Sequence, residues 1–287
     1  MKWKQITYLF ILFALLFQGC ETNAIPHHQT TGGGYGIGSV VNGQREGQWS
    51  FYRTDDTKEA EGGFEKDLEE GEWSYWYPNG AEKEKSNWHL GKMNGAYTLF
   101  YETNNTKVIG AYSMDKREGD WIWFDEAGNK KSLGSYSKDK KIGDWKSFYP
   151  NNRINTLVQY NKNVVHGKEV TWNQIGQKIL AGTNKNGLRN GKWEYWYDSG
   201  IIKNRSYWKN GELDGESKSY YPDGKEYRTG VFEKGMKNGV FKEFFKNGEI
   251  KSLETFANNK KNGLCVYYDP FGNEIKSVHY QKDEIID

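Results

Sequence analysis

The sequence has few of the residues that stabilise ordinary exported or globular domains. Only 5 Pro and 2 Cys occur among 287 residues, which excludes a Pro-rich linker and a disulfide framework. Hydrophobic residues reach 36% and aromatic residues 16%, so aliphatic side chains are too scarce for the core of a large α/β enzyme. Lysine and arginine total 40 against 38 acidic residues, a balance that argues against a nucleic-acid binder.

The one long hydrophobic run is short and lies near the N-terminus. It covers residues 6–17, follows Lys2 and Lys4, and is succeeded by Gln18-Gly19-Cys20. This is too short for a membrane-spanning helix of ~20 residues and is typical of a secretory signal peptide. Residues 1–19 are therefore predicted as a lipoprotein-type signal peptide, and the polar, Gly-rich residues 20–34 as a flexible tether.

The end of this run resembles a bacterial lipobox, in which a small residue precedes a Cys that becomes lipidated. The resemblance implies lipidation of Cys20 and a membrane-anchored lipoprotein of the bacterial cell envelope, in a leaflet that the sequence does not identify. Phe17 and Gln18 depart from the strict pattern. An ordinary signal peptide followed by an unrelated Cys, or an uncleaved anchor, therefore stays open as an alternative.

A strict repeat fills residues 35–287. One glycine recurs ten times at intervals of 24 residues, without insertion or deletion. We number each repeat from this glycine, as repeat position 0. The repeats begin at Gly47, Gly71, Gly95, Gly119, Gly143, Gly167, Gly191, Gly215, Gly239 and Gly263.

Aromatic residues recur at three repeat positions: at position 5 in all ten repeats, at position 17 in nine and at position 2 in seven. Equivalent rings on successive repeats are expected to form a structural ladder. Position 15 holds Gly or Ser in seven repeats. Such a small residue is predicted to act as a floor, a flat stretch of backbone on which the position-17 ring of a neighbouring repeat lies. The ladder residues expected at positions 2 and 5 are Trp73, Trp76, Trp121, Phe124, Trp145, Phe148, Trp193 and Trp196.

Positions 9 and 20 hold only Gly, Asn or Asp, the residues that tolerate a left-handed backbone, and each is predicted as a turn. The intervening positions 1–7 and 11–18 are predicted as strands, so each repeat is one β-hairpin. Positions 2 and 5 should point to opposite faces; either both faces carry rings, or a bulge near position 4 brings the rings together. The predicted fold is all-β, an elongated single-layer antiparallel β-meander or solenoid of about ten hairpin repeats.

The repeat resembles the bacterial variant of the MORN repeat. The pattern Gly-x-Trp-x-x-aromatic-aromatic-Pro/Asp-x-Gly carries the resemblance, as in Gly71–Gly80 and Gly191–Gly200. The resemblance implies a single-layer array of hairpins that serves as a scaffold. Some bacterial relatives are described as antitoxins, which fits poorly with a lipidated Cys20.

Little in the sequence points to catalysis. None of the five His falls at metal-ligand spacing with Cys or with another His, and adjacent His27 and His28 face apart. The repeats also offer ten similar constellations, whereas an enzyme needs a unique one. Lone Cys265 is expected to be a small buried residue. We therefore expect no enzyme activity, no cofactor and no metal site, and the sequence identifies no ligand-binding residue.

The predicted function is that of a non-catalytic envelope lipoprotein that acts as a protein-interaction scaffold. Its predicted partners are an unidentified protein and, through the N-terminal lipid, a membrane. A first alternative is binding of cell-wall glycan on aromatic platforms, which requires exposed rings at Trp73, Trp121 or Trp193. A second alternative, implied by the family resemblance, is an antitoxin-like binding protein.

Overall fold

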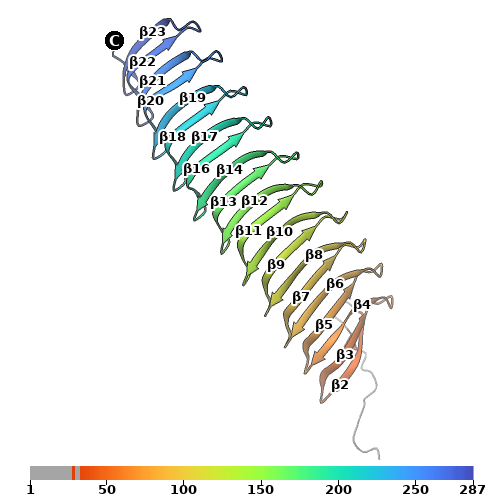
Figure 1. Ribbon diagram of the computed structural model, residues 1–287. Helices are drawn as coiled ribbons and strands as arrows, with labels where there is room; N and C mark the ends of the chain where they lie inside the picture. Colours follow the sequence, from red (N-terminus) through yellow and green to blue (C-terminus); the bar gives the residue numbers. More distant parts are fainter. Residues whose placement is uncertain (1–27, 30–32, 287) are drawn as a thin grey trace, which may run out of the picture. The chain divides into compact units, whose positions relative to one another are not determined.

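The computed structural model describes residues 28–29 and 33–286 (Figure 1). The predicted signal peptide, Cys20 and most of the predicted tether lie outside these residues. The described residues form strands and turns, without a helix. The chain divides within strand β7 into two compact units, one ending at Gly95 and the other beginning at Ala96, and each is described by itself.

The N-terminal unit is an antiparallel meander, in which each strand from β1 to β5 pairs with the strand that follows it. His28 and Gln29, in the segment predicted as a tether, pair with Gly36 and Tyr35. The strands are β1 (His28–Gln29), β2 (Tyr35–Val41), β3 (Gln44–Tyr52), β4 (Lys58–Glu65), β5 (Leu68–Trp76), β6 (Glu82–His89) and the beginning of β7 (Lys92–Phe100).

The C-terminal unit repeats the same antiparallel meander, and Asn190 interrupts one strand so that β15 and β16 both pair with β14. The all-β fold class of hairpin repeats is thus confirmed. The strands are β8 (Thr106–Ser113), β9 (Lys116–Phe124), β10 (Lys130–Ser137), β11 (Lys140–Phe148), β12 (Ile154–Asn161), β13 (Val164–Trp172), β14 (Lys178–Lys185), β15 (Leu188–Arg189), β16 (Gly191–Trp196), β17 (Ile202–Lys209), β18 (Glu212–Tyr220), β19 (Glu226–Glu233), β20 (Met236–Phe244), β21 (Ile250–Ala257), β22 (Lys260–Tyr268), β23 (Glu274–Gln281) and β24 (Glu284–Ile285).

Both predicted turns occur where Gly, Asn and Asp recur. Every residue at position 9 has a positive φ, from 62° at Asn152 to 99° at Gly248, and every residue at position 20 has one between 64° and 87°. Position 19 is also left-handed in all ten repeats, with φ between 48° and 53°, although Lys, Leu, Met or Asn occupies it. Two consecutive residues with positive φ are typical of a type I′ turn, whose twist matches that of paired strands.

The first strand of each repeat differs from its predicted bounds. It begins three residues before the position-0 glycine and ends at position 5, as β5 does from Leu68 to Trp76, except where Asn190 divides it into β15 and β16. The turn at positions 19–20 has only two residues, so the next strand pairs with the preceding one directly after it. Opposite β4, the register passes from Glu61↔Ser74 to Gly63↔Glu70, so three residues of β5 face one of β4. Gly71 lies in this bulge with φ 75°, a conformation that explains a glycine at position 0.

Aromatic residues lie on both faces of the hairpins, which answers the question left by the sequence. Trp49 and Phe51 pair with Gly62 and Ala60, whereas Ser50 and Tyr52 pair with Glu61 and Lys58 on the opposite face. A bulge does occur near position 5, but its extra residue lies in the second strand at position 12. We call the face with positions 2, 4, 15 and 17 the aromatic face, and the face with positions 1, 3, 5, 14 and 16 the polar face.

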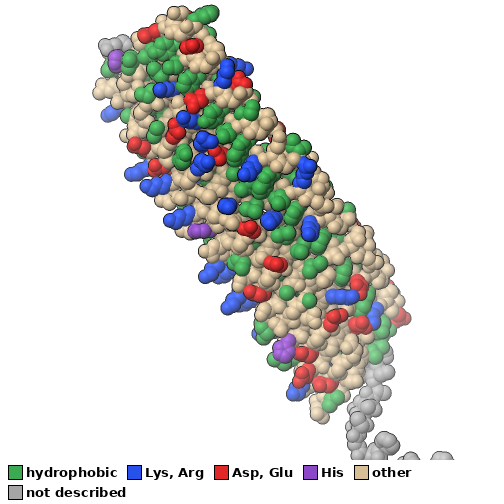
Figure 2. Space-filling view, in the orientation of Figure 1, with side chains coloured by type: hydrophobic (Ala, Val, Ile, Leu, Met, Phe, Trp, Pro, Cys, Tyr) green, Lys and Arg blue, Asp and Glu red, His purple; other side chains and the backbone are tan. Residues whose placement is uncertain are grey.

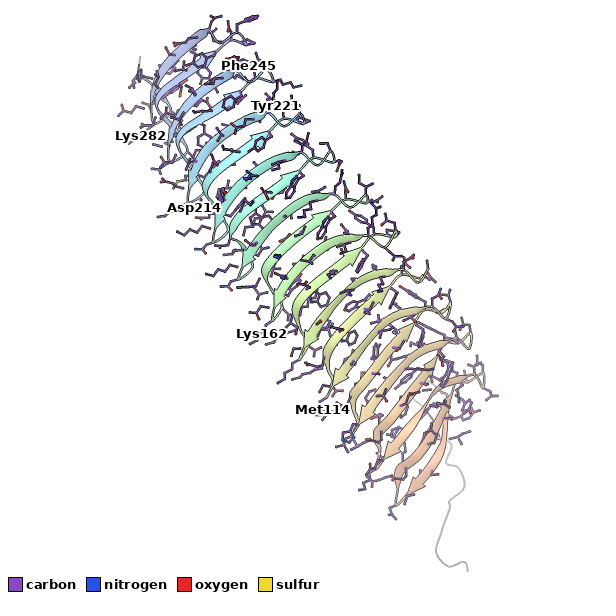
Figure 3. All side chains as sticks on the ribbon, in the orientation of Figure 1. Met114, Lys162, Asp214, Tyr221, Phe245 and Lys282 are labelled. Atoms are coloured by element: carbon purple, nitrogen blue, oxygen red, sulfur yellow. The ribbon has the colours of Figure 1, made fainter. Side chains whose placement is uncertain are left out.

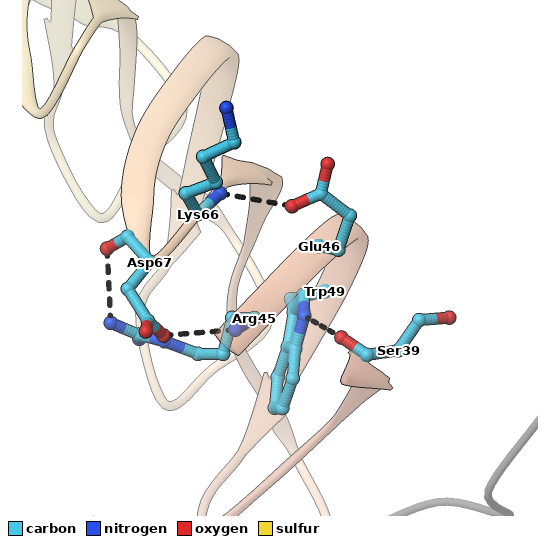
Figure 4. Close-up of polar contacts among 6 residues, drawn as sticks. All are labelled: Ser39, Arg45, Glu46, Trp49, Lys66 and Asp67. Atoms are coloured by element: carbon cyan, nitrogen blue, oxygen red, sulfur yellow. Dashed lines mark hydrogen bonds and ion pairs between the residues drawn. The ribbon is translucent and has the colours of Figure 1, made fainter. Parts of the chain in front are cut away.

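Side chains near the turns tie successive repeats together (Figure 4). The Asp67 carboxylate accepts hydrogen bonds from the backbone N–H of Arg45 (2.9 Å) and from its guanidinium Nε (3.0 Å). One residue away, the Glu46 carboxylate accepts the backbone N–H of Lys66 (2.9 Å). In the C-terminal unit the equivalent turns run along one edge of the sheet, marked by Met114, Lys162 and Lys282 in Figure 3.

Candidate functional site

The aromatic face is built from rings that meet edge to face. In the C-terminal unit, rings at positions 2 and 17 alternate at centroid distances of 5.0–6.1 Å and interplanar angles of 75–88°. This is a preferred geometry for aromatic pairs, and it lets a single sheet layer bury large rings. The alternating rings are Tyr97, Tyr112, Trp121, Tyr136, Trp145 and Tyr160.

Each position-2 tryptophan, and Phe241, lies over the glycine found eleven residues upstream. A Cβ built on Gly134 would lie 2.3 Å from Cδ2 of Trp145, and one on Gly182 would lie 2.2 Å from Cδ2 of Trp193. The position-15 glycines are therefore floors, as predicted, but the prediction that a position-17 ring covers them is wrong. The position-17 ring stands beside the floor instead, edge-on to the position-2 ring.

Cations at position 22 cover the rings from the solvent side. The Arg117 guanidinium lies 4.0 Å from the centroid of the Tyr136 ring, and the Lys141 ammonium lies 4.1 Å from that of Trp145. Such cation–π contacts are favourable, and the aliphatic stems exclude water from the ring edges. Hydrophobic side chains and basic side chains are interspersed on the face of the molecule that Figure 2 shows.

The eight predicted ladder residues divide between the two faces. Four are at position 2: Trp73, Trp121 and Trp193 are 4%, 3% and 0% exposed, and Trp145 is half-buried. The other four, Trp76, Phe124, Phe148 and Trp196, are at position 5 and half-buried on the polar face. The buried ladder therefore joins positions 2 and 17, not 2 and 5. Trp73, Trp121 and Trp193 also lack the exposure that a glycan platform would need.

Three repeats have no ring at position 2, and two of them compensate for the loss. Glu169 accepts a hydrogen bond from the Asn184 amide (2.7 Å), so a polar pair replaces both rings of that repeat. Cys265, a free thiol with 0% exposure, is in register with Val278 where most repeats have Gly or Ser. The prediction that Cys265 is a small buried residue is thereby confirmed.

The third exception is Ser217, and there the packing is left incomplete. Ser217 is in register with Ser206 on β17 and with Gly230 on β19, so three small residues lie side by side. A cavity of about 190 Å³ opens on the aromatic face at this place. It is lined by Ser217, Ser219, Arg228, Thr229, Gly230, Phe232, Lys237 and Phe241.

The cavity combines aromatic walls with positive charge. Arg228 Cζ lies 5.7 Å from the centroid of the Phe241 ring, and Lys237 Nζ lies 5.4 Å from it. Desolvation, and then the nearby charge of Arg228, lower the pKa of the Lys237 ammonium. The cavity is therefore a place where two cations share a partly dry environment.

Glu254, the acid that pairs with Arg228, is held mainly by two other residues. Glu254 Oε2 lies 4.0 Å from Arg228, while Glu254 Oε1 is 2.7 Å from Lys261 Nζ and accepts the Tyr267 hydroxyl (3.1 Å). Burial favours a raised pKa for Glu254, but its bonds with Lys261 and Tyr267 outweigh burial and keep the pKa lowered. The carboxylate therefore stays charged, and it lies closer to Lys261 than to Arg228.

Other predicted features carry less information. Among the described residues, no group of three or more His, Cys, Asp and Glu is arranged to hold a metal ion. Within residues 28–29 and 33–286, no helix has the length and hydrophobicity to cross a membrane. Cys20, the predicted lipidation site, lies outside the described residues.

Comparison with known proteins supports the repeat assignment. Four segments match the family model of the MORN repeat variant, namely residues 117–138, 189–210, 213–231 and 237–258. A comparison with curated proteins finds no match. The predicted resemblance is confirmed over these four segments, which suggest a repeat-based binding or scaffold role.

Solved structures resemble the chain only weakly. The crystal structure of TcdB2-TccC3-TEV shares 10% identity at a TM-score of 0.15, over 84% of this chain and 19% of that one. The crystal structure of TcdB2-TccC3-Cdc42 shares 9% identity at a TM-score of 0.14, over 88% of this chain and 16% of that one. This chain thus spans less than a fifth of the length of each of these chains.

Proposed function

We propose that this chain is a non-catalytic scaffold that binds a protein partner through the polar face of its repeats. The repeated rings, floors and turns stabilise the sheet, because each repeat is held by its neighbours. Positions whose residue type varies from repeat to repeat do not have this structural role. Their side chains are therefore the ones available for recognition.

The observation that carries the proposal is a change of character along positions 1 and 16 of the polar face. The repeats that begin at Gly119, Gly143 and Gly167 hold polar side chains at both positions, such as Asp120, Asp144 and Lys168. Each of the last four repeats exposes one apolar side chain at one of the two positions, and these side chains are 39–47% exposed. Exposed apolar groups bordered by charged ones are typical of the centre of a protein interface. They are Tyr207, Val231, Val240 and Leu264.

A site-specific photo-cross-linker at Val240 tests the proposal in the native envelope. The matched control is the same cross-linker at Lys168, which is also exposed at repeat position 1. We expect a discrete protein adduct from position 240 that is absent from position 168. Val240→Glu should then remove that protein from a co-purification. Equal adducts at both positions would contradict the proposal, and recovery of polysaccharide alone would favour the glycan alternative.

The location of the scaffold rests on the N-terminal motif. We propose that a lipid on Cys20 anchors the chain to a membrane of the bacterial cell envelope. Palmitate labelling of the wild-type chain, but not of Cys20→Ala, together with release of the variant from the membrane fraction, is the expected result. An unlabelled wild-type chain in the soluble fraction would overturn the anchor and leave the binding surface untouched.

A further inference from the structure

The cavity at Ser217 has the composition of a ligand site. One wall is the edge-to-face pair of Phe232 and Phe241. Three hydroxyl-bearing residues, Ser217, Ser219 and Thr229, and the two cations Arg228 and Lys237 also line it. The Ser219 oxygen accepts a hydrogen bond from Asn204 Nδ2 (3.1 Å), an arrangement that leaves the hydroxyl proton to donate. A matching ligand would be flat and apolar at one end and anionic at the other.

The size of the cavity limits the ligand further. A cavity of ~150 Å³ accepts a benzene molecule, and the volume here is about 190 Å³. The difference of roughly 40 Å³ leaves room for a small polar group beside one ring. A carboxylate fits this room and can accept two parallel hydrogen bonds from the planar Arg228 guanidinium.

We propose that the Ser217 cavity binds a carboxylate borne on a single aromatic ring. The ring lies over Ser217, which has no position-2 ring of its own, beside the edge-to-face pair of Phe232 and Phe241. The carboxylate accepts hydrogen bonds from the Arg228 guanidinium and the Lys237 ammonium. Such a group occurs in a free aromatic acid and at the C-terminal residue of a polypeptide that ends in Phe.

Electrostatics favour an anion at this place. Glu254 is bound to Lys261 and so offsets Arg228 only in part. The pKa of Lys237 is lowered by desolvation and by Arg228, so a bound carboxylate would relieve the repulsion between the two cations. The inference does not depend on the scaffold proposal, because the cavity opens on the aromatic face and the proposed partner surface is on the polar face.

Calorimetric titration of the full chain in mild detergent tests the proposal. Phenylacetate represents the free acid, and N-acetylphenylalanine represents a C-terminal residue. Their neutral amides are the matched controls. We expect at least one acid to bind, and its amide to bind at least tenfold more weakly, because the amide lacks the charge that Arg228 and Lys237 recognise. The acid that binds identifies the source; binding of neither acid up to ~10 mM overturns the proposal.

Variants locate the binding. Ser217→Tyr restores a ring at position 2 and should abolish binding while the strand signal in circular dichroism is retained. Arg228→Met and Lys237→Met keep the aliphatic stems and should each weaken binding at least tenfold. Lys141→Met removes the equivalent cation where Trp145 occupies the space, and should leave the affinity within twofold of wild type. Unchanged affinity in the folded Ser217→Tyr variant, or in both Met variants at the cavity, would contradict the assignment.

Discussion

Arg117 and Asp139 occupy successive repeats and hold each other through three hydrogen bonds. The Asp139 carboxylate accepts the backbone N–H of Arg117 (3.1 Å) and its Nε–H (2.9 Å), while the Asp139 N–H donates to the Arg117 carbonyl (3.1 Å). The same guanidinium covers the Tyr136 ring at 4.0 Å. One arginine thus links a turn, an ion pair and the aromatic face.

This link makes stability depend on pH in the acid range. The hydrogen bond from the Arg117 side chain, and then that from its backbone, hold the pKa of Asp139 below its usual value. A depressed folded-state pKa stabilises the fold above the unfolded-state pKa, and this contribution is lost as pH falls through the folded-state value. Asp139→Asn should therefore lower the free energy of unfolding at pH 7 by up to about 1 kcal/mol, and the difference should vanish at low pH. Urea denaturation across pH measures this.

Asparagine is a suitable replacement for Asp139, because another repeat has asparagine at the equivalent position. Asn163 accepts the backbone N–H of Lys141 at 2.7 Å in the equivalent link, so Asp139→Asn should keep the turn and lose only the charge. Exposed Glu126, changed to Gln, is the control and should leave the unfolding midpoint unaltered at every pH. A constant gap between Asp139→Asn and wild type down to pH 2 would show that the ion pair does not contribute.

Two buried tryptophans should respond differently to loss of the indole N–H. Trp193 Nε1 donates to the Thr183 carbonyl (3.0 Å), whereas the buried Nε1 of Trp121 has no hydrogen-bond partner. Both rings are at position 2 and lie over a glycine. Trp193→Phe loses a hydrogen bond, while Trp121→Phe removes an unsatisfied donor, so the first should cost about 1 kcal/mol more. Equal losses in denaturation experiments would mean that Trp121 Nε1 is satisfied in solution.

The glycine floors should be more sensitive to alanine than the glycine bulges. At Gly134 an added methyl group would lie 2.3 Å from Trp145, whereas at Gly143 it would meet no atom within 4 Å but would strain a residue at φ 62°. We expect Gly134→Ala to cost about 3 kcal/mol through displacement of the ring, and Gly143→Ala to cost roughly 1 kcal/mol. Trp fluorescence should change only in the first variant. A reversed order would show that the ring shifts without cost.

The hairpins could be predicted from the sequence because their turns restrict residue type so strongly. Positions 9 and 20 admit only Gly, Asn and Asp, and all are left-handed in the structure. Position 19 is left-handed too, yet Lys66, Leu90 and Met114 occupy it, so residue type alone concealed it. There the two-residue turn between strands imposes the conformation.

The packing of the rings was harder to predict, because recurrence does not reveal depth. Position 5 is aromatic in every repeat but half-buried, as at Trp196, while the less regular position 2 contains the buried Trp193. A better signal was present eleven residues upstream. Every Trp at position 2 follows a glycine at this spacing, such as Gly182 before Trp193 and Gly134 before Trp145. The cavity was foreseeable at Ser217, because position 2 of that repeat has no ring.

The same spacing predicts which ring would fill the cavity. Tyr97, at position 2, follows Ser86 by eleven residues, as Ser217 follows Ser206, so a tyrosine suits a serine at that spacing. Ser217→Tyr should raise the free energy of unfolding by about 1–2 kcal/mol, because it places apolar surface in a cavity of about 190 Å³.

Cys265→Tyr makes a matched control at the same repeat position. Cys265 has 0% exposure and is in register with Glu254 and Val278, so the added ring is overpacked and should cost about 1–3 kcal/mol. Thermal unfolding of both variants measures these opposite changes in stability. Destabilisation by Ser217→Tyr would mean that the cavity closes in solution, with its walls already in contact.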